Sequence, residues 1–198
     1  MLRFLSLLPL ASLSLCTNFP WEAVQLTEHE PENYPDIAFG DLTGRYARYT
    51  GPKCRASPGD HSWPSVKEWD RFNKTLGGAL LKPVLPAAAC YQGPYYDAKK
   101  CNFLLTQARQ TRFYSDDPVS IFTDWPTGNT CSASANPVGN CTQGGYPEYV
   151  VNATTVKHIQ LAVNFARNRH LRLVIKSVHQ CVSWTRGIGV LTRQKRGP

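Results

Sequence analysis

Neither of the common zinc-site spacings, C-x2-C and H-x3-H, occurs in this 198-residue sequence, so its seven cysteines and five histidines predict no metal centre. Acidic residues are also in the minority, because 14 Asp and Glu stand against 22 Lys and Arg, for a formal net charge of +8. Many of the basic residues lie after Ala166, and no nucleic-acid-binding motif accompanies them. A nucleic-acid partner is therefore not expected.

A run of apolar residues long enough to cross a membrane as a helix is missing too. The apolar run from Phe4 to Leu15 follows Arg3 and ends beside the small residues Ser14 and Cys16. This arrangement predicts a secretory signal peptide over residues 1–16, the alternative being a buried N-terminal helix. We therefore expect a secreted protein that has no membrane segment after signal removal.

Secretion changes what the cysteines predict, because disulfides persist in oxidising compartments. Cys90 and Cys101 bracket one loop rich in turn-forming residues, and Cys131 and Cys141 bracket another. We predict a disulfide in each pair, worth about 2–3 kcal/mol by the chain-entropy model. Cys54 has no evident partner.

Three Asn-x-Thr sequences, which begin at Asn73, Asn140 and Asn152, are candidate N-glycosylation sites and agree with secretion. Asn140 stands beside the predicted Cys131–Cys141 disulfide, and we expect it to be poorly accessible.

The chain is long enough for one sizeable domain, and 42% of its residues are hydrophobic. Residues 17–53 contain several prolines and many acidic residues, which predicts an extended lead-in. A helix is predicted after it, capped by Ser62 or Ser65 and ended by Gly77-Gly78.

Trp63 lies just before this helix and Trp69 lies within it. The two rings could form a wall that stacks on a ligand, or they could pack in the core. Core packing is favoured, because aromatic side chains dominate core burial. The stretch ALLKPVLPAAAC predicts an edge strand or an extended connector, since prolines interrupt it. NFLLTQARQTRFY predicts a further short helix. The adjacent acids Asp116 and Asp117 precede a proline, which favours an exposed turn over a catalytic pair.

The best-defined unit of the sequence covers residues 149–176. Tyr149-Val-Val151 is β-prone, and Thr154 and Thr155 supply a polar stop and a helix cap. Apolar residues then recur at helical spacing as far as Ala166, and residues 171–175 form a second β-prone run. A β-α-β unit of this length predicts two parallel strands, with any ligand site directly after Ile175.

Several stretches in the same order carry a resemblance to a known family: CRASPGDHSWPS, LLKPVLPAAAC, DPVSIFTDWPTGNTC and GYPEYVVNATTVKHIQLAVNFARNRHLRLVIK. The chain resembles secreted fungal FAD-linked oxidases, the berberine-bridge-enzyme-like members of the vanillyl-alcohol-oxidase superfamily, over residues 54–176. The resemblance implies an α+β fold, the N-terminal part of a PCMH-type FAD-binding domain. It also implies FAD as cofactor, a small-molecule substrate and hydride transfer to the flavin, followed by reoxidation with oxygen.

The family's second strand ends in a Lys-x-x-Gly-His-Asp loop, which wraps the FAD pyrophosphate and whose histidine is commonly bonded to the flavin. The corresponding cofactor-binding positions are Lys176, Ser177, Val178 and His179, and they do not keep the motif. Glycine is missing, Val178 is a poor residue for positive φ, and His179 lies one position early. No catalytic residue can be assigned.

Residues 177–198 show no clear apolar period, and we expect an unstructured tail that is foreign to the fold. A retained intron, a frameshift or a genuine isoform would each explain it, and genomic DNA across the junction would distinguish them. Two function classes remain: an FAD-dependent oxidoreductase, of which this chain is an inactive part, and a non-catalytic secreted glycoprotein that does not bind FAD. The sequence leaves the oligomeric state undefined.

Overall fold

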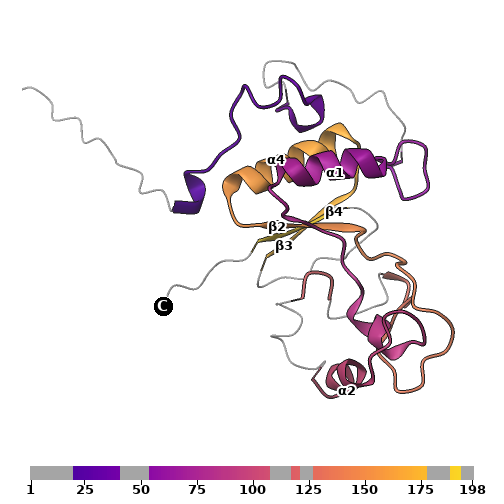
Figure 1. The fold of residues 1–198 in the computed structure, drawn as a ribbon. Coiled ribbons are helices and arrows are strands. Elements are labelled where there is room, and N and C mark those ends of the chain that lie inside the picture. Colours follow the sequence, from indigo (N-terminus) through magenta and orange to yellow (C-terminus); the bar gives the residue numbers. More distant parts are fainter. Residues whose placement is uncertain (1–19, 41–53, 108–116, 121–126, 178–187, 193–198) are drawn as a thin grey trace, which may run out of the picture.

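The computed structural model describes residues 20–40, 54–107, 117–120, 127–177 and 188–192. Its four strands are β1 (Leu80–Leu81), β2 (Tyr149–Ala153), β3 (Leu173–Ser177) and β4 (Ile188–Thr192). They form one mixed sheet in the order β1-β2-β4-β3. Figure 1 shows helices α1 and α4 side by side over one face of this sheet, and α2 beyond the opposite face. The fold is α+β, as predicted.

Helix α1 (Val66–Thr75) begins at Ser65 and not at Ser62. Ser65 and Glu68 form a reciprocal capping box, in which Glu68 N donates to Ser65 Oγ and Ser65 N donates to Glu68 Oε2 at 2.7 Å. Gly77 and Gly78 both have positive φ, and Gly78 N donates to Asn73 O at 2.9 Å. The predicted start and end of this helix are therefore confirmed.

Helix α4 (Val156–Asn168) begins at Thr155, whose hydroxyl accepts a hydrogen bond from His158 N. The centre of its apolar face is buried, with Leu161 and Phe165 both at 0% exposure. The predicted β-α-β unit is confirmed as β2, α4 and β3.

The two helices meet the sheet through an aromatic core. The ring of Phe165 stacks on Phe72 with centroids 4.0 Å apart, and the ring of Trp69 stacks on Tyr149 at 4.1 Å. Trp63 packs against Trp69 at 5.5 Å. The two tryptophans thus serve core packing, as aromatic burial favoured, and not a ligand-stacking wall.

The sheet departs from the sequence prediction at its centre. β2 and β3 are parallel, but β4 lies between them and pairs in parallel with both. The expectation of an unstructured tail over 177–198 is therefore wrong for Ile188–Thr192, because the two flanking strands satisfy hydrogen bonds on both sides of that segment. Residues 178–187 and 193–198 lie outside the described part of the chain.

The described part of the lead-in forms a strap, defined here as residues 24–38, across the outer sides of α1 and α4. It contains the 3-10 turn η2 (Pro35–Ile37), and η1 (Pro20–Glu22) precedes it. Ile37 of the strap is buried, with only 1% of its surface exposed. Side-chain amides of α4 hold the strap's carbonyls: Asn164 Nδ2 donates to Ile37 O at 3.0 Å, and Asn168 Nδ2 to Ala38 O at 3.0 Å.

Charged side chains hold the strap in the same way. Lys157 forms an ion pair with Glu30, and this partner lowers the pKa of the Glu30 carboxyl below its usual range. Arg169 reaches Glu68 of α1 at 2.5 Å and Asp36 of the strap at 3.8 Å. The described part of the lead-in, residues 20–40, contains turns and two 3-10 segments and is not simply extended, and these contacts bind it to the domain. Residues 41–53 are outside the described segments.

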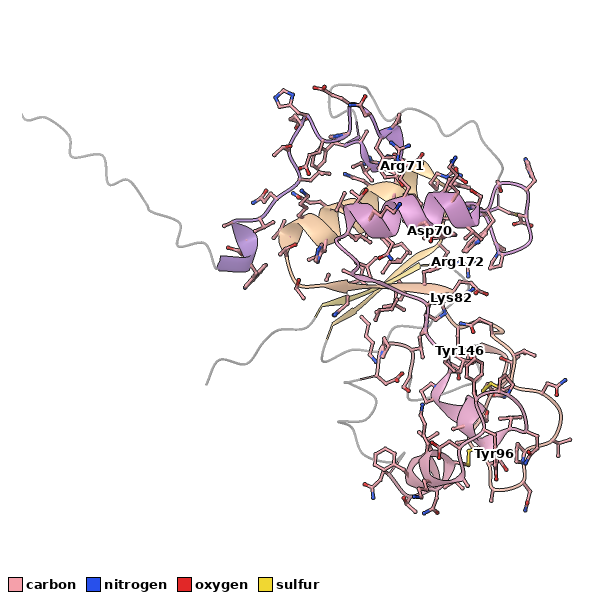
Figure 2. The ribbon with its side chains drawn as sticks, in the orientation of Figure 1. Asp70, Arg71, Lys82, Tyr96, Tyr146 and Arg172 are labelled. Atoms are coloured by element: carbon pink, nitrogen blue, oxygen red, sulfur yellow. A yellow bond between two sulfur atoms is a disulfide. The ribbon has the colours of Figure 1, made fainter. Side chains whose placement is uncertain are left out.

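A disulfide lobe, defined here as residues 85–107 and 127–146, lies on the other side of the sheet. It contains the 3-10 turn η3 (Pro86–Cys90) and α2 (Ala98–Gln107). Both predicted disulfides are present, with Cα–Cα distances of 4.8 Å for Cys90–Cys101 and 4.4 Å for Cys131–Cys141. Cys54 is exposed and has no disulfide partner among the described residues. In Figure 2 the lobe turns Tyr146 toward the sheet and holds Tyr96 farther away.

A small second core joins the lobe to the sheet. Val150 of β2 packs there with Leu85, Val119 and Tyr146, and all four are at most 5% exposed. No helix among the described residues has the length and apolar character needed to cross a membrane.

Candidate functional site

The three parallel strands end together at one edge of the sheet. The register aligns Ala153 of β2 and Ser177 of β3 with Thr192 of β4. In parallel sheets, ligands bind outside the carboxyl ends of the strands. This edge is therefore the candidate functional site, in the place predicted after Ile175.

Lys176 is the one of the four predicted cofactor positions whose side chain lies in the described part of the structure. Its side chain is 1% exposed, and its amine donates to Asp117 O at 2.6 Å and to Ser120 O at 3.1 Å. A charge-assisted bond to a carbonyl is stronger than a neutral one. Lys176 therefore ties the end of β3 to the segment 117–120 and directs its charge at main-chain oxygens.

The segment that Lys176 holds is itself folded around a carboxylate. Asp117 Oδ1 accepts hydrogen bonds from Val119 N at 3.0 Å and Ser120 N at 2.7 Å. This is a local turn made by an aspartate side chain, but the turn is half-buried to buried and not exposed as predicted, because Val119 packs in the second core and Lys176 binds its carbonyls. Asp116 lies outside the described residues. Sequence reasoning missed that the turn faces Lys176, because a main-chain acceptor leaves no signature in residue type.

Asn152 occupies the same row of the sheet. The register places Leu191 of β4 opposite both Asn152 and Lys176, so the two polar side chains lie on one face with β4 between them. Asn152 Oδ1 is buried and has no hydrogen-bond partner among the described residues. A side-chain oxygen at this position can accept a hydrogen bond from an N–H or O–H group, but it does not attract an anion such as a phosphate.

His158 stands at the start of α4, near the same edge. Its Nδ1 accepts a hydrogen bond from Thr154 N at 3.2 Å. Burial lowers the pKa of the His158 ring, the neighbouring charge of Lys157 lowers it further, and a hydrogen bond to the Leu76 backbone opposes both. The ring is therefore neutral at pH 7, and its role here is to cap the connection between β2 and α4.

The remaining predicted cofactor positions are only partly described. Ser177 is the last residue of β3, and Val178 and His179 are outside the described residues. An FAD pyrophosphate needs a nest of main-chain N–H groups, which glycine makes possible. Here the Lys176 amine is bound to carbonyls, Asn152 offers an acceptor, and no glycine occurs between Ser177 and Arg186. The residues present at this edge do not fit the pyrophosphate of FAD.

The three candidate glycosylation sites differ in exposure. Asn140 and Thr142 are exposed, contrary to the expectation of poor access, because within residues 138–142 only Cys141 is half-buried and the loop residues 138–140 before it are all exposed. Asn73 and Asn152 are half-buried, one in α1 and the other in β2. No group of three or more metal-ligating side chains occurs in the described segments.

The similar proteins found by sequence comparison are flavoprotein oxidases and FAD-linked oxidoreductases. The chain is 34% identical over 145 residues to VAO615, a VAO-type flavoprotein oxidase of Thermothelomyces thermophilus, and the match covers 71% of this chain and 25% of VAO615. It is 33% identical over 146 residues to the FAD-linked oxidoreductase hmp9 of Hypomyces subiculosus, with 71% of this chain and 23% of hmp9 covered. No family model matches.

Solved structures agree. The crystal structure of the VAO-type flavoprotein MtVAO615 from Myceliophthora thermophila C1 superposes with a TM-score of 0.64 at 32% identity, over 70% of this chain and 26% of that one. MtVAO713 from the same organism gives a TM-score of 0.63 at 32% identity, over 72% and 26%. The chain thus spans about a quarter of the length of the relatives it matches.

Proposed function

Because this chain belongs, over 71% of its length, to the VAO-type flavoprotein oxidases and FAD-linked oxidoreductases, we propose that it supplies one wall of the FAD site of such an oxidase. Its relatives' names support FAD as the family cofactor. The hydride transfer from a small-molecule substrate belongs to the full-length enzyme, since the chain matches only a quarter of its relatives.

We propose further that the 198 residues do not bind FAD by themselves. The observation that carries this is the strand edge, where the Lys176 amine is bound to Asp117 O and Ser120 O instead of facing a ligand. A large cofactor is normally buried over most of its surface, and one wall cannot provide that.

Flavin titration tests the proposal. FAD fluorescence and absorbance should stay unchanged when the purified chain is added at micromolar concentration. A hybrid of residues 1–176 with the corresponding downstream region of VAO615 should be yellow. If the chain itself binds FAD and His179→Ala abolishes binding, His179 is a genuine flavin ligand and the proposal is wrong.

A non-catalytic secreted glycoprotein is the second candidate function. The bonding of the Lys176 amine to Asp117 O and Ser120 O supports a chain that does not bind FAD, and the signal-like sequence of residues 1–16 and the two disulfides agree with its secretion. Secretion agrees with either function, whereas flavin in the hybrid enzyme distinguishes them. A colourless hybrid would favour the glycoprotein.

A further inference from the structure

Three Asn-x-Thr sequences occur in the chain, and the fold gives them very different surroundings. N-glycosylation requires the Asn amide nitrogen to reach the anomeric carbon of an oligosaccharide carried on a lipid pyrophosphate. The N–C bond forms, the bond from carbon to pyrophosphate oxygen breaks, the amide nitrogen loses one proton, and the lipid pyrophosphate leaves. The product must then leave room for a sugar chain in the folded protein.

Asn152 cannot meet that requirement within this fold. It lies inside β2, which pairs with β1 on one side and with β4 on the other. Its main-chain N–H donates to Ala79 O at 2.9 Å, and its Oδ1 is buried. Its side chain is half-buried on the same face of the sheet as the buried Lys176, where a glycan on the amide nitrogen would crowd the neighbouring side chains.

Asn73 is also engaged by the fold. It lies in the last turns of α1, and its Oδ1 accepts a hydrogen bond from Leu80 N at 3.1 Å. The side chain thereby joins the end of α1 to β1 and is half-buried. Its threonine is engaged as well, since Thr75 Oγ1 donates to Arg71 O at 3.0 Å.

Asn140 differs from Asn73 and Asn152 in both its exposure and its hydrogen bonding. It is exposed in the loop that the Cys131–Cys141 disulfide closes, after Gly139 with φ +78°. Thr142 is exposed too, and its recorded contacts use only the main chain: its N donates to Thr130 O, and its O accepts from Thr130 Oγ1. The described residues provide no hydrogen bond to the Asn140 side chain.

The loop also presents apolar surface that a sugar chain would cover. Val138, two residues before Asn140, is 95% exposed, the highest value among the large exposed hydrophobic residues.

We propose that Asn140 is the N-glycosylated residue of the folded protein and that Asn73 and Asn152 are not modified. This inference rests on the proposed entry into the secretory pathway, and it is independent of FAD binding. The modification is an N-linked oligosaccharide on the loop between Cys131 and Cys141.

The test uses the full chain expressed in a eukaryotic host. The membrane-enclosed fraction is isolated, and the protease-resistant, disulfide-bonded chain is treated with peptide N-glycosidase in heavy-oxygen water, which converts each glycosylated Asn to a labelled Asp. The label is expected at position 140 alone. Thr142→Ala should remove the whole mass shift, whereas Asn73→Gln and Asn152→Gln should leave it unchanged.

Label at position 73 or 152 in the folded chain would overturn the inference, as would an enclosed chain with no label. A chain found only in the cytosol would overturn the proposed secretion together with the glycan. None of these results bears on flavin binding by the hybrid enzyme, so the two proposals fail separately.

Discussion

Lys176 carries a positive charge into the interior of the protein, where its amine is held by the main-chain oxygens of Asp117 and Ser120. Replacement with methionine keeps most of the side-chain volume but removes the donor from both carbonyls. We expect Lys176→Met to lower the free energy of unfolding by about 1–3 kcal/mol, the usual cost of unpaired buried polar groups. Urea unfolding followed by tryptophan fluorescence measures it.

Lys176→Arg is the matched control, since it keeps the charge and can still donate to both oxygens. It should recover part of the lost stability. A Lys176→Met variant as stable as the unmodified chain would show that the link between β3 and residues 117–120 contributes nothing.

Tyr34 presents the opposite case, a buried hydroxyl without a hydrogen-bond partner among the described residues. Arg71 lies over its ring at 4.0 Å, and burial raises the pKa of the phenol to about 12. Tyr34→Phe keeps the ring and should leave the free energy of unfolding unchanged or slightly higher at pH 7, because no bond is lost.

The sign of the pH effect follows from that raised pKa. Above pH 10 the unfolded phenol ionises and the folded one does not, so the unmodified chain loses stability as the pH rises from 10 toward 12. Tyr34→Phe should remove this contribution to the loss. Unfolding curves at pH 7 and pH 11 compare the two proteins, and an equal alkaline loss in both would contradict the assignment.

At the scale of elements, helix α1 depends on its capping box. Ser65→Ala removes the acceptor for Glu68 N and one donor to the Glu68 carboxylate. We expect a loss of about 1 kcal/mol in the free energy of unfolding. Ser62→Ala is the control, since Ser62 precedes the helix by a full turn, and it should have little effect. Thermal unfolding followed by circular dichroism measures both, and equal losses would place the cap elsewhere.

The elements that could be predicted from sequence are those whose causes are local. Ser65, Thr155 and Gly77-Gly78 act within one helical turn, so residue type and spacing identify them. The two disulfides likewise follow from short loops. β4 could not be predicted, because Ile188–Thr192 shows no alternation and becomes a strand through pairing with segments far away in the sequence.

The candidate site was predictable in position but not in detail. A β-α-β unit places its ligand edge after the second strand, and the structure agrees. What Lys176 does there could not be inferred, since its partners are carbonyls of Asp117 and Ser120. The strap was missed for the same reason: the amides of Asn164 and Asn168 donate to main-chain oxygens of residues 35–38, and a main-chain acceptor has no signature in residue type.

At the scale of the whole molecule, β4 holds the sheet together. A chain ending after residue 187 would leave β2 and β3 without their shared neighbour, and we expect it to lose most of its stability and to aggregate through the open strand edges. A chain ending at Thr192 is the control and should unfold like the full sequence. Equal unfolding midpoints for the two shortened chains would show that residues 188–192 do not belong to the sheet.

The central place of β4 also has a consequence for biosynthesis. β2 and β3 leave the ribosome before the strand that joins them, so residues 1–177, about nine-tenths of the 198, can build helices and close disulfides while the sheet still has a gap at its centre. Pairing between strands distant in sequence is slow to form. The nascent chain therefore exposes two strand edges until residues 188–192 have been synthesised, and this interval is when chaperones are most needed.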